Sequence, residues 1–323
     1  MAELTPLAKK IKSLNELREE SNGAVVANAL QSALSDRSQR VIAKAAELCG
    51  ELQLPELMSQ LLDAYQRMYV NPLKKDLGCL AKTAIVTALT KLECPEVDPF
   101  RRGVKYEQFE PVWGGQEDTA PMLRAACAAG MVGCAPRMEA ILCCADLLAD
   151  RCRPARIGAA RALHGLGHWE GVPLLRLKLQ SGDDPEVLGE CASALLGLAP
   201  DESRELVMGL LSSPHTDVRV QAAFALGEAR SVGAFEPICD CWRHEQEPAT
   251  RGLLMTCIGL LRSPESRQFL IAQIDGPDPT AAADAIRALA PYALIEELRE
   301  AVEAAVENSD SQRLRGVFED EFG

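Results

Sequence analysis

The stretch that decides the fold is HTDVRVQAAFALGEARSVGAFEPICDCW, residues 215–242. It starts with polar residues that suit a helix N-terminus and continues with small residues at helical spacing. It then breaks around a glycine and resumes as a second apolar segment. This order predicts two short helices joined by a turn. Such a hairpin cannot bury its apolar faces alone, so it predicts similar copies stacked on either side.

Copies of this pattern recur along the chain, each with an apolar residue at an equivalent position. From residue 131 onward these positions lie 31 or 32 residues apart, and the neighbouring residues on the same helical stripe are mostly small. Small side chains let adjacent helices approach closely. The sequence therefore predicts an all-α fold, an α-α superhelix of about eight helical hairpins without a β-sheet core. The equivalent positions are Cys49, Leu89, Met131, Leu163, Leu195, Leu226, Ile258 and Leu289.

The regularity of the repeat suggests a division of the chain. Residues 1–35 are more charged and are expected to be N-terminal capping helices. Residues 36–306 form the repeat array, with an irregular insertion at 94–121 where the spacing lengthens. Residues 307–323 are an acidic C-terminal tail for which we expect disorder.

Composition excludes several classes of function. The net charge of −13 argues against a basic surface for nucleic acid. No apolar run approaches the roughly 20 residues that span a bilayer, and the N-terminus lacks an apolar signal segment, so we expect a cytoplasmic protein. The twelve cysteines contain no C-x-x-C pair and are expected to pack as small hydrophobic residues, without a metal.

A partial ladder of basic residues lies seven positions before the equivalent apolar residues. Because it follows the repeat, we expect these side chains to form hydrogen bonds between neighbouring repeats. A row of anion-binding cations is the alternative. The ladder consists of Lys82, Arg124, Arg156, Arg219 and Arg251.

Three segments, DVRVQAAFALGEAR, PARIGAARALHGLG and DDPEVLGECASALLGLA, resemble HEAT repeats. The resemblance extends to the short HEAT-like class found in phycobilisome lyases. It covers residues 118–306 well and 36–92 less regularly. It implies an α-solenoid and leaves function open, because this class includes scaffolds, adaptors and a few enzymes.

Some proteins with HEAT-like repeats are enzymes, and the sequence can be compared with two of these classes. Deoxyhypusine hydroxylase holds iron with His-Glu pairs, whereas the equivalent dipeptides here are Ile157-Gly158, Gly189-Glu190 and Val220-Gln221. A phycobilin lyase acts mainly by binding a bilin and its acceptor protein, so it stays open as the alternative. No P-loop, nucleophile elbow or dinucleotide motif is present. We therefore expect no catalytic residues and no cofactor.

The insertion holds four of the fourteen aromatic residues, Phe100, Tyr106, Phe109 and Trp113. Amphipathic aromatics are favoured at binding surfaces, but they could instead cover the seam of an irregular repeat. A second cluster, ICDCWRHEQEP at 238–248, contains possible metal ligands. On a helix, however, Cys239 and His244 do not share a face with Cys241 and Glu245.

These observations predict a noncatalytic scaffold or adaptor that binds a partner protein through its concave face and the irregular loop. In arrays of this type the second helix of each pair usually lines the inner face, which points to residues around 170–180, 203–212, 234–245 and 264–274. The acidic balance favours a basic partner, although evenly spread charge that solvates the surface explains it equally well. The candidate contact residues are Tyr106, Phe109, Trp113, Arg176, Lys178, Trp242, Arg243 and Gln268.

Overall fold

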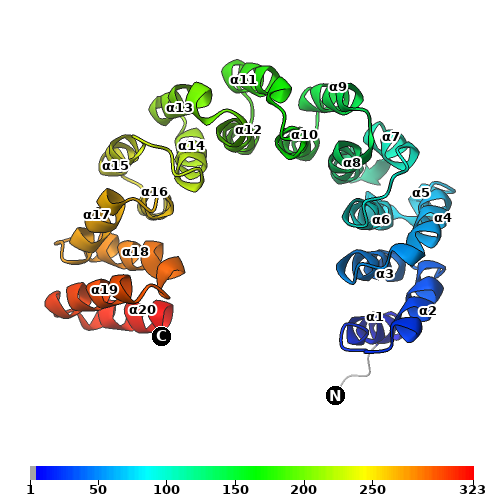
Figure 1. Cartoon of the computed structure of the whole chain (residues 1–323), viewed down its shortest axis with the longest axis horizontal. Helices are drawn as coiled ribbons and strands as arrows, with labels where there is room; N and C mark the ends of the chain where they lie inside the picture. Colours follow the sequence, from blue (N-terminus) through cyan, green and yellow to red (C-terminus); the bar gives the residue numbers. More distant parts are fainter. Residues whose placement is uncertain (1–4) are drawn as a thin grey trace. The chain divides into compact units, whose positions relative to one another are not determined.

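A computed structural model describes residues 5–323 and confirms the all-α fold. Short helices follow one another throughout the described chain, and one two-stranded hairpin interrupts them (Figure 1). The contacts divide the chain into two compact units, Met1–Gly167 and His168–Gly323, called here unit 1 and unit 2.

The described part of unit 1, residues 5–167, contains ten α-helices, two short 3₁₀ turns and the hairpin. The helices are α1 (Pro6–Glu16), α2 (Gly23–Leu34), α3 (Gln39–Glu51), α4 (Met58–Met68), α5 (Pro72–Lys75), α6 (Leu80–Lys91), α7 (Asp98–Val104), α8 (Pro121–Cys134), α9 (Arg137–Leu148) and α10 (Arg153–Leu166). The 3₁₀ turns are η1 (Pro55–Leu57) and η2 (Leu77–Cys79), and the strands are β1 (Phe109–Val112) and β2 (Gly115–Asp118).

Unit 2 contains ten further α-helices and three 3₁₀ turns. The helices are α11 (Val172–Ser181), α12 (Pro185–Leu198), α13 (Pro200–Gly209), α14 (Thr216–Glu228), α15 (Phe235–His244), α16 (Pro248–Leu260), α17 (Pro264–Ile274), α18 (Pro279–Leu289), α19 (Glu296–Asn308) and α20 (Gln312–Phe322). The 3₁₀ turns are η3 (Trp169–Gly171), η4 (Leu210–Ser212) and η5 (Ala290–Tyr292).

The eight equivalent apolar positions all lie on separate helices and are buried, which confirms the repeat. We call α3, α6, α8, α10, α12, α14, α16 and α18 the reference helices. Within unit 2, α12 packs on α14, α14 on α16 and α16 on α18. Small buried residues such as Ala192, Ala223 and Ala285 hold these helices close together.

The predicted assignment of the inner layer is wrong. In unit 2, Figure 1 shows α12, α14, α16 and α18 along the inner side of the curve, and α11, α13, α15 and α17 along the outer side. The reference helices are the first helices of the pairs as we delimited them. Their small side chains allow the closest packing, so this layer is the shorter one and lies on the concave side.

The helix starts follow ordinary capping chemistry. Proline occupies the first position of α16, α17 and α18, where a missing N–H costs nothing. The Asp278 carboxylate accepts hydrogen bonds from the first amides of α18, and Ser263 caps α17 in the same way. These signals are local, so they can be recognised in the sequence.

The hairpin was not predicted from the sequence. Strand β1 pairs antiparallel with β2, with Val112 opposite Gly115, so Trp113 and Gly114 form the turn. Gly114 has a φ of 87°, a backbone conformation that side chains disfavour. A glycine at the second position of a two-residue turn is a recognised turn signal, because it adopts positive φ without strain. It was missed because the flanking segments lack alternating apolar residues.

The expectation of disorder at the C-terminus is also wrong, because residues Gln312–Phe322 form helix α20. This helix packs on α18 and α19 and buries Leu314 and Phe322. Its apolar residues occur at helical spacing, but the acidic residues between them concealed the pattern. The boundaries proposed for the capping helices and the array stay predictions.

Candidate functional site

The insertion is anchored to unit 1 through a buried lysine on α6. Lys82 Nζ lies 2.9 Å from Asp76 Oδ2 and donates to Gln108 Oε1 at 3.0 Å. The rings of Tyr69 and Tyr106 lie 5.4 and 5.2 Å from the same ammonium. A buried charge is stable only with such partners. Gln108, just before β1, is therefore held in place by the repeat core.

A second buried ion pair fixes the other strand. Arg124 on α8 donates to Asp118 Oδ2 at 2.8 Å and to Asp150 Oδ2 at 2.8 Å. Burial alone would raise the pKa of Asp118, but hydrogen bonds from the Gln108 and Ala120 amides and from Arg124 outweigh it, so the pKa is lowered. Asp118 is thus ionised near neutral pH and ties the end of β2 to α8.

A third group of hydrogen bonds, centred on the Glu110 carboxylate, holds the base of the hairpin. Glu110 Oε1 accepts hydrogen bonds from the Gly78 amide at 2.6 Å and from Gln108 Nε2 and Thr119 Oγ1, both at 2.7 Å. The hairpin base is therefore held to α6, α8 and η2 by charged and hydrogen-bonded groups. Such anchoring limits its conformational freedom.

Apolar side chains nevertheless face solvent on this anchored hairpin. We call Phe109, Val112 and Trp113 the hairpin surface. Phe109 is 40% exposed, Val112 is 46% exposed, and Trp113 is fully exposed at the turn. The Arg151 guanidinium lies 4.9 Å from the centre of the Phe109 ring. Two of the candidate contact residues, Phe109 at the base and Trp113 at the turn, therefore lie on the same hairpin.

Tyr106, in contrast, belongs to the anchor. Its hydroxyl donates to Gln108 Oε1 at 3.0 Å, and its ring meets the edge of the Tyr69 ring at 4.8 Å. Burial raises the pKa of Tyr106. Phe100 is also buried. Each of the two interpretations of the insertion therefore applies to part of it. Tyr106 and Phe100 cover the seam of the irregular repeat, whereas Phe109 and Trp113 face solvent and are available for binding.

The basic ladder makes the predicted structural contacts. Lys82 and Arg124 hold the insertion, as described above. Arg156 donates to the Asp150 carbonyl, Arg219 pairs with Glu245 at 3.0 Å, and Arg251 lies 3.7 Å from Asp278. Arg124, Arg219 and Arg251 reach the segment just before the next reference helix, whereas Arg156 bonds the turn before its own helix. The structural interpretation of the ladder is confirmed.

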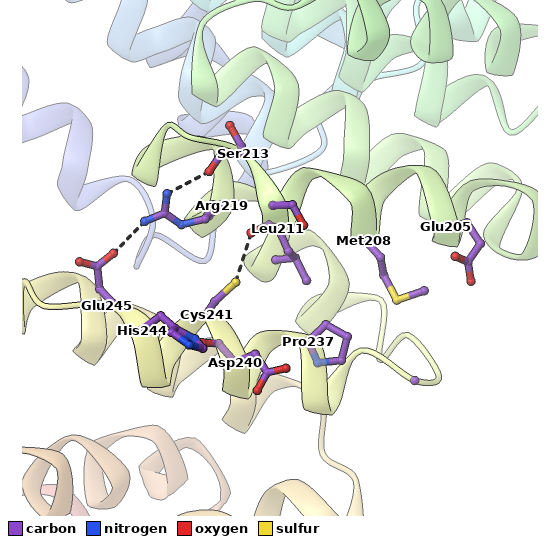
Figure 2. A pocket seen from close by; sticks show the side chains of 12 residues that line it. Glu205, Met208, Leu211, Ser213, Arg219, Pro237, Asp240, Cys241, His244 and Glu245 are labelled. Atoms are coloured by element: carbon purple, nitrogen blue, oxygen red, sulfur yellow. Dashed lines mark hydrogen bonds and ion pairs between the residues drawn. The ribbon is translucent and has the colours of Figure 1, made fainter.

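Unit 2 contains an open groove of about 700 Å³ between α15 and the α13–η4 segment (Figure 2). Arg219 donates to the Ser213 carbonyl at 3.0 Å and to Glu245 Oε2 at 3.0 Å. Cys241 Sγ donates to the Leu211 carbonyl at 3.4 Å, and burial raises the pKa of this thiol. These groups are engaged with one another, so the groove offers little reactive chemistry.

The other candidate contact residues lie on outer-layer helices of unit 2. Arg176 on α11 donates to the Glu202 carbonyl at 2.8 Å, and Lys178 pairs with Asp183. Arg243 on α15 pairs with Asp240 at 2.7 Å, and Gln268 on α17 is exposed. They are not on the concave side, for the packing reason given above.

Trp242 is largely buried, which sequence alone did not indicate. Its ring contacts the Phe269 ring edge-on at 5.5 Å, and the Arg251 guanidinium lies 4.6 Å from its centre. It therefore joins α15 to α16 and α17. A partner could not reach most of this side chain.

Residues 5–323 contain no group of three or more His, Cys, Asp or Glu side chains arranged to hold a metal ion. All twelve cysteines are free thiols, and eight of them are buried. For these eight, the expected packing as small hydrophobic residues is confirmed, whereas Cys134, Cys143, Cys152 and Cys241 are partly exposed. Within the same residues, no helix is both long enough and apolar enough to cross a membrane.

Comparison with known families agrees with this architecture. Residues 203–290 match the family model for HEAT repeats. The chain carries HEAT repeats. The match begins within α13 and ends at the residue after α18. No curated protein matches the chain.

Several solved structures are similar to this chain. The complex of CpcE and CpcF of phycocyanin lyase from Nostoc sp. PCC7120 is 16% identical, with a TM-score of 0.43, and the alignment covers 79% of this chain and 93% of that one. An engineered protein is 16% identical, with a TM-score of 0.35 and coverage of 90% and 86%. Human deoxyhypusine hydroxylase in complex with glycerol is 17% identical, with a TM-score of 0.30 and coverage of 95% and 91%.

Proposed function

We propose that this HEAT-repeat chain is a noncatalytic scaffold or adaptor, and that it binds a partner protein first through the hairpin surface. The observation that carries the proposal is the full exposure of Trp113 at the end of a hairpin whose base is anchored by buried ion pairs. Exposing a large aromatic ring to water is unfavourable, and tryptophan is enriched where it anchors protein interfaces. The hairpin surface therefore fits a binding role.

The anchoring network supports the same proposal, because it reduces the conformational entropy that the hairpin would lose on binding. A loop that must be ordered on binding loses conformational freedom and therefore affinity. Lys82, Glu110 and Arg124 hold the base of this hairpin before any partner arrives. The partner would then meet a preformed apolar edge, flanked by the Arg151 guanidinium.

The second proposed contact area is the concave side, which in unit 2 is formed by the reference helices. In unit 2 the exposed residues of these helices include Asp217 and Glu228 on α14 and Leu253 on α16, which is 45% exposed. Acidic and apolar groups on one side suit a partner segment with basic and apolar residues. The net charge of −13 acts in the same direction by steering a basic partner toward the chain.

The experiment compares Trp113→Ala with Trp169→Ala, an exposed tryptophan in unit 2 that lies outside the proposed site. Partners captured from an extract of the native host by wild-type protein are purified, and their affinities are measured. We expect Trp113→Ala to weaken binding by about tenfold or more, as for an interface anchor. Trp169→Ala should leave the affinity unchanged.

Thermal melting provides the control for folding. Because the Trp113 side chain is fully exposed, its removal should leave the melting temperature unchanged. If Trp113→Ala binds every partner as tightly as wild type does, the hairpin is only a cover for the seam, and the proposed site is wrong.

A further inference from the structure

We propose that Cys94 and Cys134 are a redox modification site, at which the two thiols form a reversible disulfide that closes the irregular insertion. Nothing in the proposed partner binding requires this bond, so either proposal can fail without the other.

The two thiols share one pocket in unit 1. A cavity of about 510 Å³ lies between the loop after α6 and the C-terminal half of α8. Cys94 and Cys134 both line it, together with the Phe100 ring and the backbone of Gly130 and Gly133. The Phe100 ring fills the space beside Gly130, whereas nothing lies within 4 Å of the position that a Cβ atom at Gly133 would take, so the pocket is open on the Gly133 side. A small oxidant can therefore reach a pair of thiols there.

The backbone of one residue brings the two sulfur atoms near each other. Cys134 Sγ donates to the Glu96 carbonyl at 3.9 Å and to the Gly130 carbonyl at 3.3 Å. Glu96 is two residues after Cys94, so the Cys134 thiol lies beside the chain segment that carries Cys94. Both thiols also line the same cavity.

Exposure distinguishes Cys134 from Cys94, which is 3% exposed, and from the fully buried cysteines near it. Cys134 is only partly buried, whereas Cys127, further back on α8, is completely buried against Tyr65. Cys144 on α9 is also completely buried. Attack on an oxidant requires access as well as a thiolate. Cys134 is therefore the residue that reacts first, and Cys94 is the residue that resolves the product.

The chemistry balances with a peroxide as the oxidant. The Cys134 thiolate attacks one peroxide oxygen, the O–O bond breaks, and water leaves after protonation, which gives a sulfenic acid. The Cys94 thiolate then attacks the Cys134 sulfur, the S–O bond breaks, and a second water leaves as the disulfide forms. Both sulfur atoms are oxidised and the peroxide is reduced to two waters. A thiol reductant reverses the step.

The positions of Cys94 and Cys134 in the chain determine which segment the disulfide would constrain. A Cys94–Cys134 disulfide encloses residues 95–133 in a covalent loop, which contains α7, the hairpin and almost all of α8. Burial raises the pKa of both thiols, so they are mostly protonated near neutral pH and the pair responds slowly to peroxide. The site suits sustained oxidative stress.

The test treats the full-length chain with hydrogen peroxide at mildly alkaline pH and blocks the remaining thiols. Peptides are then mapped by mass spectrometry without reduction. We expect linked peptides containing Cys94 and Cys134, a mass lower by two hydrogen atoms, and full reversal by dithiothreitol. Cys134→Ser should abolish the link, whereas Cys143→Ser, a partly buried cysteine on α9, should leave it intact.

Three results would overturn the proposal. The first is that both thiols are still free after treatment that oxidises other cysteines. The second is that Cys134 forms its link with a residue other than Cys94. The third is that Cys134 proceeds to sulfinic acid in wild-type protein without any disulfide. Because the mapping uses wild-type protein, each result is decisive even if a variant folds poorly.

Discussion

At the residue scale, the buried charges explain how this array tolerates an insertion. The in-phase basic positions predicted hydrogen bonds between repeats, and Lys82 and Arg124 do make such contacts. Their partners Asp76, Gln108 and Asp118 could not be predicted, because they come from irregular segments with no periodic pattern. Each completes the hydrogen bonding of a cation that would otherwise be buried alone.

The Lys82→Met variant tests this network. It leaves the Asp76 carboxylate buried without its cation, so we expect the free energy of unfolding to fall by about 3–5 kcal/mol in urea denaturation followed by circular dichroism. Arg18→Met is the matched control, because its ion pair with Glu51 is exposed and should be worth at most about 1 kcal/mol. Equal losses for the two variants would mean that the buried pair does not hold the insertion.

At the scale of elements, close packing between helices decides which positions on a helix of unit 1 tolerate a larger side chain. Gly158 on α10 faces the Ala125 backbone on α8, and a Cβ atom there would collide with it. Gly165 on the same helix has open space, with Val132 Cγ1 at 4.0 Å from a Cβ atom. The two glycines are alike in sequence, and only their neighbours distinguish them.

We therefore expect opposite effects from two alanine substitutions on α10. Gly158→Ala should destabilise the chain by about 1–3 kcal/mol, because overpacking forces α8 and α10 apart. Gly165→Ala should stabilise it by up to about 1 kcal/mol through better helix propensity. Thermal and urea melts of the two variants check this. A neutral or stabilising Gly158→Ala would show that α10 is not seated closely on α8.

At the scale of the whole molecule, the chain consists of two units that meet in sequence at Gly167–His168. The segment around this junction is polar and glycine-rich, and His164, Gly167, His168 and Trp169 are exposed. Exposed connections between compact units are favoured sites for proteolysis. The hairpin is also exposed but is anchored at its base.

Limited digestion with proteinase K should therefore cut first within residues 164–171 and give two fragments of nearly equal size. Intact-mass measurement of the earliest products identifies the site. Early cleavage within residues 109–118 would instead show that the hairpin opens readily, and would count against its rigid presentation of Trp113.

The sequence by itself determined the helical repeat, its spacing, the packing role of the cysteines and the structural role of the basic ladder. These properties depend on side-chain size and helical periodicity, which are local. Only the tertiary structure decided which layer is concave, that α20 packs on the last repeat, and that Tyr106 is an anchor while Trp113 faces solvent. Those outcomes depend on distances between segments far apart in sequence, and no periodic pattern encodes such distances.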